Sequence, residues 1–388
     1  MKILIVNTLY SPYKIGGAEI SVQALAEEFN LLGITVGVLT LGESDDFEVI
    51  NNISIWRLKL ENIFWPFNNQ LKSSLLKLRW HAKDANNKGY DKKIKSIFES
   101  YKPDILFTNN LSGFSTRIWE LAKPQKIKVV HTIRDYYLQC PKTTKFKNGN
   151  NCDSLCLECK VLTALKKRNS TKIDYVVGIS NFVLQDHLKQ GYFKNVKSKV
   201  IYNGFNFDFK HKQFKFLNKE EVVFGYLGQI NKEKGVELML ESFGKIKNKE
   251  KWRLLVAGNI EKEYKSKLKG INDNNRIEYL GYTNSTDFFK KIDVLIVPSL
   301  WNEPFGRVVL EGIINNKIVI TSKKGGIIEI MENNQDFTFN LGNEELKNLI
   351  DNIIDKRNKL KYTHNQEFLT KFNIKRTALD YYETFSKI

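Results

Sequence analysis

Long apolar runs are missing from this sequence of 388 residues. No stretch approaches the ~18 uncharged apolar residues that a membrane-spanning helix needs, so such a helix is not expected. The first residues, 1–7, enter a short strand pattern directly, without the longer apolar region and small-residue cleavage site of a signal peptide. We therefore expect a cytoplasmic protein.

Cysteine is also scarce, with 4 residues in the chain. Hydrophobic residues make up 42% and aromatic residues 12%, enough to build a core without disulfides or metals. This excludes a wholly disordered protein. The length exceeds that of one typical core, and no repeat of 20–50 residues appears, so we expect two domains and no solenoid.

Acidic residues are outnumbered: 43 Asp and Glu face 61 Lys and Arg, a formal charge of +18. Residues 1–205 carry a net charge of +12 and the remainder +6. One interpretation is a Lys-rich codon usage. The other is an anionic partner of the first half, which would be a membrane surface, a nucleic acid or a phosphorylated substrate.

Short apolar strand patterns alternate with helical patterns in both halves, which predicts doubly wound parallel sheets. The expected strands include Ile3–Asn7, Val200–Asn203, Val222–Leu227 and Val294–Pro298. The rhythm stops over residues 206–219, where Lys and Phe lack periodicity, and restarts after residue 220. We therefore predict a first domain over 1–205, a linker over 206–219, a second domain over 220–372 and a C-terminal helix over 373–388. In that helix Ala378, Leu379, Tyr382 and Phe385 would share a face.

Neither the dinucleotide fingerprint nor the P-loop is present. Instead Gly16 and Gly17 follow the first strand and precede a helical pattern over Ala18–Leu31. Adjacent glycines let backbone N–H groups approach an anion at a helix N-terminus, although a plain tight turn has the same composition.

The second half carries denser motifs. The turn Gly228–Gly235 follows a strand and contains Lys234, a natural point charge for phosphate. Glu303 follows a later strand, and Glu311 comes two turns into a helix expected over Phe305–Ile314, with Pro304 at its start. The N–H groups of Phe305 and Gly306 would meet a phosphate there, while both carboxylates accept sugar hydroxyls. Taken singly, each carboxylate could equally be a surface residue.

These motifs, with Gly281-Tyr282, Asp293 to Ser299, Gly325-Gly326 and Glu329, resemble the donor domain of retaining glycosyltransferases of family 4. Asn203-Gly204 and the first glycine pair are similar to that family in kind and order, so the resemblance covers almost the whole chain. It implies a GT-B fold: two Rossmann-like domains facing across a cleft, with the last helix crossing back to the first domain. It also implies a metal-independent, retaining transferase that holds a UDP- or GDP-type nucleotide sugar in its second domain and the acceptor in its first.

By this resemblance, Glu303 would contact the donor sugar, Glu311 the ribose, and Lys234 and the Gly17 N–H the diphosphate. Two positions depart from the family pattern. Gln229 stands where the family usually has Arg.

The second departure concerns the family's active-site His, which usually precedes an Asp at a strand end. That place before Asp135 is held by Arg134, while His131 lies three residues earlier, on the opposite face of a strand. We assign Arg134 and Asp135 to the site, with His131 as the second choice.

All the cysteines fall within 20 residues, at positions Cys140, Cys152, Cys156 and Cys159. Four thiolates suit a tetrahedral structural zinc, and the last two form a common half-site. The alternative is four reduced thiols in a flap on the acceptor side.

Residues 63–83 combine aromatic and basic side chains with leucines at helical spacing: Phe64, Trp65, Phe67, Leu71, Lys72, Leu75, Lys77, Leu78, Arg79, Trp80 and Lys83. That composition suits a helix on an anionic membrane, with Trp80 as an interfacial ring. An amphipathic helix packed on the sheet would look the same.

The resemblance, together with the basic first domain, implies a hexosyltransferase that extends a glycan or lipid-linked acceptor in cell-surface polysaccharide synthesis, in the cytoplasm or on the inner membrane face. A rival enzyme class keeps the fold but uses water or phosphate as acceptor, as a GT-B epimerase or phosphorylase does. A non-enzymatic nucleic-acid binder would explain the charge but not the paired carboxylates, so we expect no nucleic acid as partner.

Overall fold

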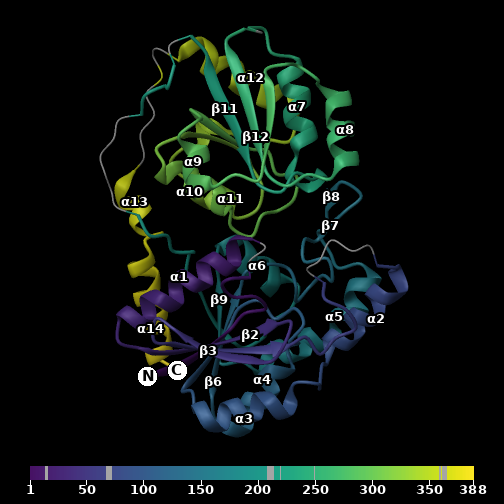
Figure 1. The fold of residues 1–388 in the computed structure, drawn as a ribbon, viewed down its shortest axis with the longest axis vertical. Coiled ribbons are helices and arrows are strands. Elements are labelled where there is room, and N and C mark those ends of the chain that lie inside the picture. Colours follow the sequence, from purple (N-terminus) through teal and green to yellow (C-terminus); the bar gives the residue numbers. More distant parts are fainter. Residues whose placement is uncertain are drawn as a thin grey trace. The chain divides into compact units, whose positions relative to one another are not determined.

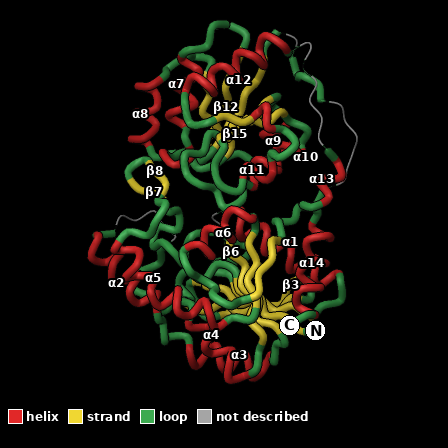
Figure 2. Tube along the Cα trace, turned by 180° about the vertical axis from the view of Figure 1, so that it is seen from behind, coloured by secondary structure: helices red, strands yellow, loops and turns green. Residues whose placement is uncertain are grey.

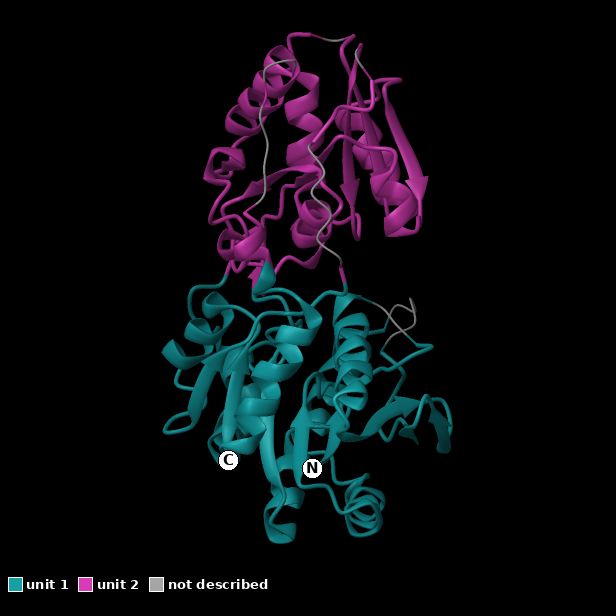
Figure 3. Cartoon of the chain, turned by 90° about the vertical axis from the view of Figure 1, so that its left-hand side faces the viewer, with its two compact units in different colours: residues 1–145, 152–206, 370–388 teal, residues 146–151, 207–369 magenta. Residues whose placement is uncertain are grey.

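The computed structural model describes residues 1–13, 16–66, 72–207, 214–218, 220–248, 250–357, 360 and 365–388. The chain divides into two compact α/β units, coloured separately in Figure 3. The first unit holds residues 1–145, 152–206 and 370–388, and the second holds 146–151 and 207–369. Of the linker expected at 206–219, residues 208–213 and 219 lie outside the described residues.

The first unit is built on an eight-stranded sheet in the order β10-β9-β6-β5-β1-β2-β4-β3. Its strands are β1 Lys2–Val6, β2 Thr35–Gly42, β3 Asp46–Ile50, β4 Ile53–Lys59, β5 Ile105–Thr108, β6 Lys128–Ile133, β9 Tyr175–Gly178 and β10 Lys197–Val200. Neighbours are parallel except β3, which pairs antiparallel with β4. Ile3, Leu4 and Ile5 of β1 are fully buried, as parallel strands covered on both faces require.

Two strands of this sheet differ from the sequence prediction. β10 was expected over Val200–Asn203 but begins three residues earlier, because a partly exposed edge strand can begin with the polar residues Lys197, Ser198 and Lys199. β3 was not expected. It is an exposed edge strand whose Phe47 and Val49 are more than half exposed, so it lacks the unbroken buried run by which its neighbours were found.

Helices cover both faces of the first sheet (Figures 1 and 2). They are α1 Gly17–Leu31, α2 Ser74–Ala85, α3 Asp91–Tyr101, α4 Arg117–Ala122, α5 Leu157–Asn169, α6 Asn181–Lys189 and α14 Ile374–Ser386, with short 3₁₀ turns at Lys123–Gln125 and Ser170–Lys172. Helices α2 and α5 lie side by side in both views.

The last helix, α14, belongs to the first unit. Its Tyr381 ring lies 6.3 Å from Phe29 and 5.0 Å from Phe107, in a core cluster that Phe385 also joins. The expected face was partly wrong: Leu379 and Tyr382 are more than 40% exposed, because the buried stripe runs one residue earlier through Tyr381. Burial of these rings fixes the chain end to the first sheet.

The second unit is built on a six-stranded parallel sheet in the order β13-β12-β11-β14-β15-β16. Its strands are β11 Val222–Leu227, β12 Trp252–Ala257, β13 Ile277–Gly281, β14 Val294–Val297, β15 Ile318–Ser322 and β16 Thr338–Phe339. Its helices are α7 Val236–Gly244, α8 Lys262–Ile271, α9 Ser285–Phe289, α10 Arg307–Ile314, α11 Ile327–Ile330 and α12 Asn343–Lys356, with 3₁₀ turns at Lys232–Lys234 and Gln335–Phe337. Helix α13, Gln366–Thr370, ends at the boundary with the first unit.

A short hairpin also belongs to the second unit, although it comes from the first half of the chain. Its strands are β7 Phe146–Lys147 and β8 Asn150–Asn151, paired antiparallel. The first domain predicted over residues 1–205 was continuous and did not set this hairpin apart.

Both large sheets are doubly wound. The strand order reverses between β1 and β5 in the first sheet, and between β11 and β14 in the second. Ligands of such sheets bind beyond the carboxyl ends of the strands at this switch point. The α/β class with two Rossmann-like units is therefore confirmed, and so is the return of the last helix to the first.

Among the described residues, no helix is long and apolar enough to cross a membrane.

Candidate functional site

The turn after β11 presents Lys234 at the switch point of the second sheet. Asn231 begins this turn, and its Oδ1 accepts a hydrogen bond of 3.1 Å from the Lys234 N–H. Gly235 follows with φ +74°, and a Cβ there would come within 1.9 Å of the Pro298 carbonyl oxygen. Only glycine can bring the two backbones so close, so the turn is held against the end of β14.

Glu303 lies in the loop after β14 and pairs with this lysine. Lys234 Nζ is 2.6 Å from Glu303 Oε1, and Ser299 Oγ donates to the same oxygen at 2.7 Å. The ammonium also lies 5.0 Å from the centre of the Trp301 ring. The lysine side chain is 25% exposed and the glutamate side chain 11%, so a ligand can reach the pair from the lysine side.

The charge on Glu303 is kept in spite of its burial. Burial by itself would raise the pKa of this carboxyl, but the Lys234 ammonium and the Ser299 hydroxyl outweigh it and lower the pKa below its usual range. Glu303 is therefore an ionised hydrogen-bond acceptor at neutral pH, which is the form that accepts sugar hydroxyls.

Hydrogen bonds from neighbouring strands and turns fix the loop that carries Glu303. Ser322 Oγ donates to the Ser299 carbonyl at 2.7 Å, and the Leu300 N–H donates to Glu233 O at 2.8 Å. The Gly326 N–H donates to Glu303 O at 2.7 Å. The loop is therefore anchored by hydrogen bonds on both sides of the carboxylate, as a preorganised binding site requires.

Helix α10 begins later than the sequence predicted. It runs from Arg307, and its cap is Gly306 with φ +95°, where a Cβ would meet Ile327 Cγ1 at 2.6 Å. Pro304 therefore precedes the helix by three residues and does not open it. Phe305 is buried, so it anchors the loop before the helix.

Glu311, at the middle of α10, pairs with a residue of its own helix. Arg307 Nε donates to its Oε1 at 2.8 Å. Burial raises the pKa of Glu311 in spite of this cation. Gln229, on the turn after β11, is exposed, and its carbonyl oxygen accepts a bond of 2.6 Å from the Tyr226 hydroxyl.

In the first unit, Arg134 and Asp135 follow the carboxyl end of β6. Arg134 is buried, and its guanidinium donates to Asn109 Oδ1 at 2.8 Å and to Asn203 Oδ1 at 2.6 Å. Two asparagines from separate loops thus fix the orientation of the arginine side chain.

Asp135 accepts from the Tyr137 N–H at 2.8 Å and from Asn110 Nδ2 at 3.0 Å. Burial raises its pKa to about 6, although the Tyr137 bond acts in the opposite direction. A carboxyl with such a pKa changes its charge close to physiological pH.

His131 lies inside the first unit. It is 3% exposed, and its Nδ1 is 3.0 Å from Thr108 Oγ1. The rings of Trp119 and Phe193 flank it at 5.0 and 6.0 Å. Burial lowers its pKa to about 3, so it is neutral and serves as an internal hydrogen-bonding group.

The glycine pair lies at the start of α1. Gly17 is the first residue of this helix of 15 residues, and the Gly16 N–H donates to Glu19 Oε2 at 2.9 Å. The expected glycine loop at a helix N-terminus is therefore present, with one of its N–H groups bonded to the helix's own carboxylate.

None of the four cysteines, all of which the structure describes, forms a disulfide. The Cys159 thiol lies within hydrogen-bonding reach of Cys140 and Cys156, and burial with these neighbours raises its pKa. In the described part of the chain, which includes every cysteine, no three His, Cys, Asp or Glu side chains have the geometry of a metal site. The arrangement matches the reduced-thiol alternative better than a tetrahedral zinc.

The residues of segment 63–83, which was expected at a membrane, differ in their exposure. Residues 67–71, with Phe67 and Leu71, lie outside the described residues. Trp80 was expected at the surface, but it is 3% exposed and donates from Nε1 to Phe64 O at 2.9 Å, because α2 packs that face inward. Leu75 and Leu78 of α2 remain exposed, as do Leu157 and Val161 of the neighbouring α5.

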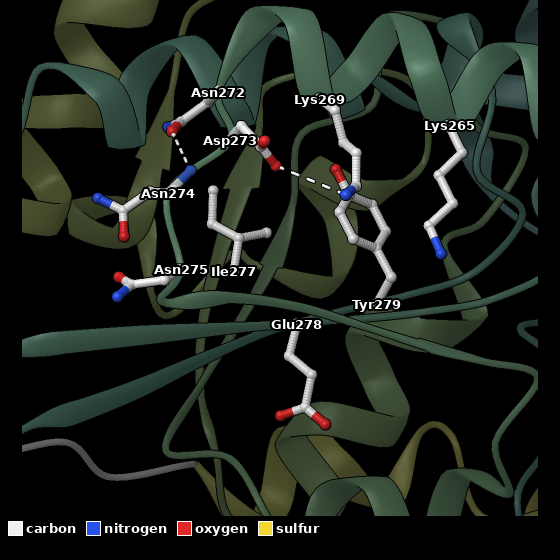
Figure 4. A pocket seen from close by; sticks show the side chains of 9 residues that line it. All are labelled: Lys265, Lys269, Asn272, Asp273, Asn274, Asn275, Ile277, Glu278 and Tyr279. Carbon is white, nitrogen blue, oxygen red and sulfur yellow. Dashed lines mark hydrogen bonds and ion pairs between the residues drawn. The ribbon is translucent and has the colours of Figure 1, made fainter.

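A hollow of about 420 Å³ in the second unit is lined by residues other than Lys234 and Glu303 (Figure 4). It is lined by α8 and the segment that enters β13, where Lys269 Nζ lies 3.7 Å from Asp273 Oδ1 and Lys265 lies 5.4 Å from the Tyr279 ring. The hollow begins at the amino end of β13. Glu303 and Lys234 instead follow carboxyl ends of strands, so the hollow is a separate feature.

The sequence reasoning missed several residues of the site. Ser299 was inside a recognised motif but was given no role, and Arg307 was not seen as the partner of Glu311. Asn151, which bonds the loop before Glu303, was also missed. The dipeptide Asn148-Gly149, a strong hairpin signal, could have drawn attention to it.

Comparison with known proteins gives consistent matches along the chain. Residues 15–209 match the family model described as Glycosyltransferase Family 4, and residues 207–367 match Glycosyl transferases group 1. An uncharacterized 42.6 kDa protein in the cps region of Klebsiella pneumoniae is 37% identical over 334 residues, which cover 85% of this chain and 87% of the relative.

Two solved structures share the fold over the full length of both chains. Anabaena HepE in complex with UDP-glucose has a TM-score of 0.70 at 18% identity. The lipopolysaccharide outer core galactosyltransferase WaaB, in its apo form, has a TM-score of 0.68 at 15% identity.

Proposed function

Because this chain belongs to glycosyltransferase family 4, we propose that it transfers a hexose, with retention of configuration, from a nucleotide sugar to a glycan or lipid-linked acceptor of a cell-surface polysaccharide. The observation that carries the proposal is the pair of Lys234 and Glu303, 2.6 Å apart on the two loops that flank the switch point of the second sheet. A cation and an ionised carboxylate at that point suit a diphosphate and a sugar together.

In the donor site, Lys234 meets the diphosphate and stabilises the charge that develops on it as the sugar leaves. Glu303, oriented by Ser299, accepts hydroxyls of the sugar. Glu311 turns from Arg307 to the ribose, and the N–H groups at Phe305, Gly306 and the start of α10 face the phosphates.

One further group belongs to this proposed donor site: Gln229 contributes from its exposed position on the turn after β11. In this scheme the leaving group is stabilised by side-chain and backbone donors, so no metal takes part in the transfer.

In the acceptor unit, Asp135 is the group proposed to act at the reacting centre. Its raised pKa lets it accept or hold a proton near neutral pH. Arg134, held by Asn109 and Asn203, keeps a positive charge next to it. His131 is too deeply buried to contact a substrate, and we assign it a structural role.

The donor is proposed to be a UDP-sugar before a GDP-sugar. Anabaena HepE, with the same fold, was solved with UDP-glucose. The polysaccharide context is supported by the Klebsiella relative in a cps region.

We further propose that the first unit docks on an anionic membrane surface through α2 and α5. The exposed leucines and valine of these neighbouring helices are accompanied by exposed Lys77, Arg79, Lys160 and Lys167. Apolar side chains beside cations are the composition of an interfacial surface. Such docking would bring a lipid-linked acceptor within reach.

The test of this function is a donor screen. Calorimetry with a panel of UDP- and GDP-sugars should identify one that binds, and its nucleoside diphosphate should be released only when an acceptor-containing membrane fraction is added. Release without any acceptor would favour the epimerase or phosphorylase class. Binding of no nucleotide sugar would refute the proposal.

A further inference from the structure

The hairpin over residues 146–151 is shaped by its two central residues. Asn148 and Gly149 have φ values of 53° and 83°. Positive values at both positions give the tight turn that matches the twist of two antiparallel strands, and Asn-Gly favours it. The hairpin therefore presents the residues of β8 in a fixed orientation, and these residues belong to the second unit.

Asn151, the last residue of β8, uses both ends of its amide on one loop. Its Nδ2 donates to the Leu300 carbonyl at 2.8 Å, and its Oδ1 accepts from the Asn302 N–H at 2.7 Å. An amide suits this double contact, because it carries a donor group and an acceptor oxygen side by side. An aspartate would keep the acceptor but place a charged oxygen against the Leu300 carbonyl.

These two bonds anchor the middle of the loop 299–303, between the groups that other main-chain bonds hold. Glu233 O receives the N–H groups of Leu300 and Trp301, at 2.8 and 3.3 Å, and Gly326 binds Glu303 O. The Leu300 carbonyl and the Asn302 N–H lie between these anchors and are bonded by the hairpin instead. The residue directly before Glu303 is thus fixed by a segment from the other half of the sequence.

We infer that Asn151 is a positioning residue of the donor site, which acts through the loop 299–303 to hold the Glu303 carboxylate in place. The inference rests on the proposed role of Glu303 toward the donor sugar. It implies that the donor site is assembled from both halves of the sequence, since the second half alone lacks the partner of Leu300 and Asn302.

The first test needs no substrate. Hydrogen–deuterium exchange should be measured on peptides that cover residues 299–305 in the full chain, for Asn151→Ala, Asn151→Asp and the control Asn150→Ala, whose side chain is exposed on the same strand. Exchange should become faster in both Asn151 variants and stay unchanged in the control. Unchanged exchange in both Asn151 variants would overturn the inference, whether or not the protein is a transferase.

The second test separates positioning from folding. For Asn151→Ala we expect kcat/KM for the donor to fall by about tenfold to a hundredfold, because a small displacement of an orienting group has effects of this order. UDP-glucose, the probe suggested above, should bind more weakly, because Glu303 is proposed to contact the sugar and the loss of one hydrogen bond changes affinity severalfold. UDP without sugar does not reach this carboxylate and should bind within about twofold of wild type. Equal losses for UDP and UDP-glucose would overturn the inference and indicate a general defect of the unit. If wild type binds neither probe, the proposed function fails, and the exchange result still decides the positioning role.

Discussion

Ser299 and Lys234 converge on a single atom, Oε1 of Glu303, at 2.7 and 2.6 Å. The lysine comes from the turn after β11 and the serine from the loop after β14, so the two strands that flank the switch point each supply one partner. The carboxylate is thereby ionised and oriented before any ligand arrives. Preorganisation of this kind is what distinguishes a binding site from a surface ion pair.

Replacement of Ser299 by Ala should weaken transfer without affecting the fold. The variant loses one hydrogen bond to a charged group, which contributes about 1.5–3 kcal/mol, so kcat/KM should fall by about tenfold to a hundredfold. The control is Ser242→Ala, another buried serine of the second unit, whose hydroxyl bonds Leu238 O of its own helix α7 and Asn343 O of α12. Steady-state kinetics on both variants check this, and equal activities would contradict the role of Ser299.

Gly325 should not tolerate alanine. It has φ +63°, and an added Cβ would lie 2.2 Å from Glu303 O. The matched control is Gly281→Ala, which has φ +68° and open space around the Cβ. Chemical denaturation should show a loss of roughly 1–2 kcal/mol for the control, the cost of the left-handed backbone, and a clearly larger loss for Gly325→Ala. Equal losses would mean that the loop moves aside freely.

Asp135 should produce a pH dependence of both stability and rate. Its folded-state pKa of about 6 is above the ordinary 3.8, so the folded state binds more protons between these values, and stability falls as pH rises from about 4 to 6. In Asp135→Asn this component of the thermal-unfolding profile should vanish. In the same variant kcat/KM should be much lower than in the wild type, and its fall on the acidic side near pH 6 should be lost. An unchanged limb in the variant would assign it to another group.

The cysteines should behave as reduced thiols. Protein purified without added metal is expected to carry far less than one zinc per chain, and a thiol reagent should react with Cys152 and Cys156 before the buried Cys140. Metal analysis and timed thiol titration check this. One tightly held zinc per chain would show that the cluster closes around a metal and would restore the zinc alternative.

Membrane docking can be tested on two leucines of equal exposure. Leu157 on α5 is 78% exposed and Leu31 on α1 is 77% exposed. Anionic vesicles should bind the wild-type protein less strongly as salt is added, because exposed charges are screened. Leu157→Asp should reduce that binding severalfold, and Leu31→Asp should leave it unchanged. Equal effects of both variants would contradict docking through α2 and α5.

How far the sequence alone could lead is clear from particular elements. β11 was predicted at its exact bounds, and β1 and β14 within one residue, because unbroken apolar runs between turns leave little choice. The edge strand β3 was not predicted, because most of its residues are exposed and its pairing with β4 cannot be seen in the local sequence pattern. Helix α10 was placed two residues early, because the left-handed Gly306 that sets its start has no periodicity.

The site divides in the same way. Glu303, Lys234 and Glu311 could be named from motif spacing, because each sits in a loop or helix directly after a strand. Asn151 could not, since its contact with Asn302 joins positions 151 residues apart through a hairpin whose docking is a tertiary property. The burial of His131 and Trp80 was likewise decided by packing partners that are distant in sequence.

The most direct test of the account is acceptor-dependent sugar transfer by Glu303→Gln and Lys234→Ala. A labelled donor identified by the screen and an acceptor-containing membrane fraction would be used, with Lys290→Ala, which breaks an exposed ion pair with Asp287 in the same unit, as the control. Both site variants should lose about a hundredfold or more of the transfer rate while they remain folded at the assay temperature, and the control should keep wild-type activity. Near-normal transfer by both purified site variants would contradict it.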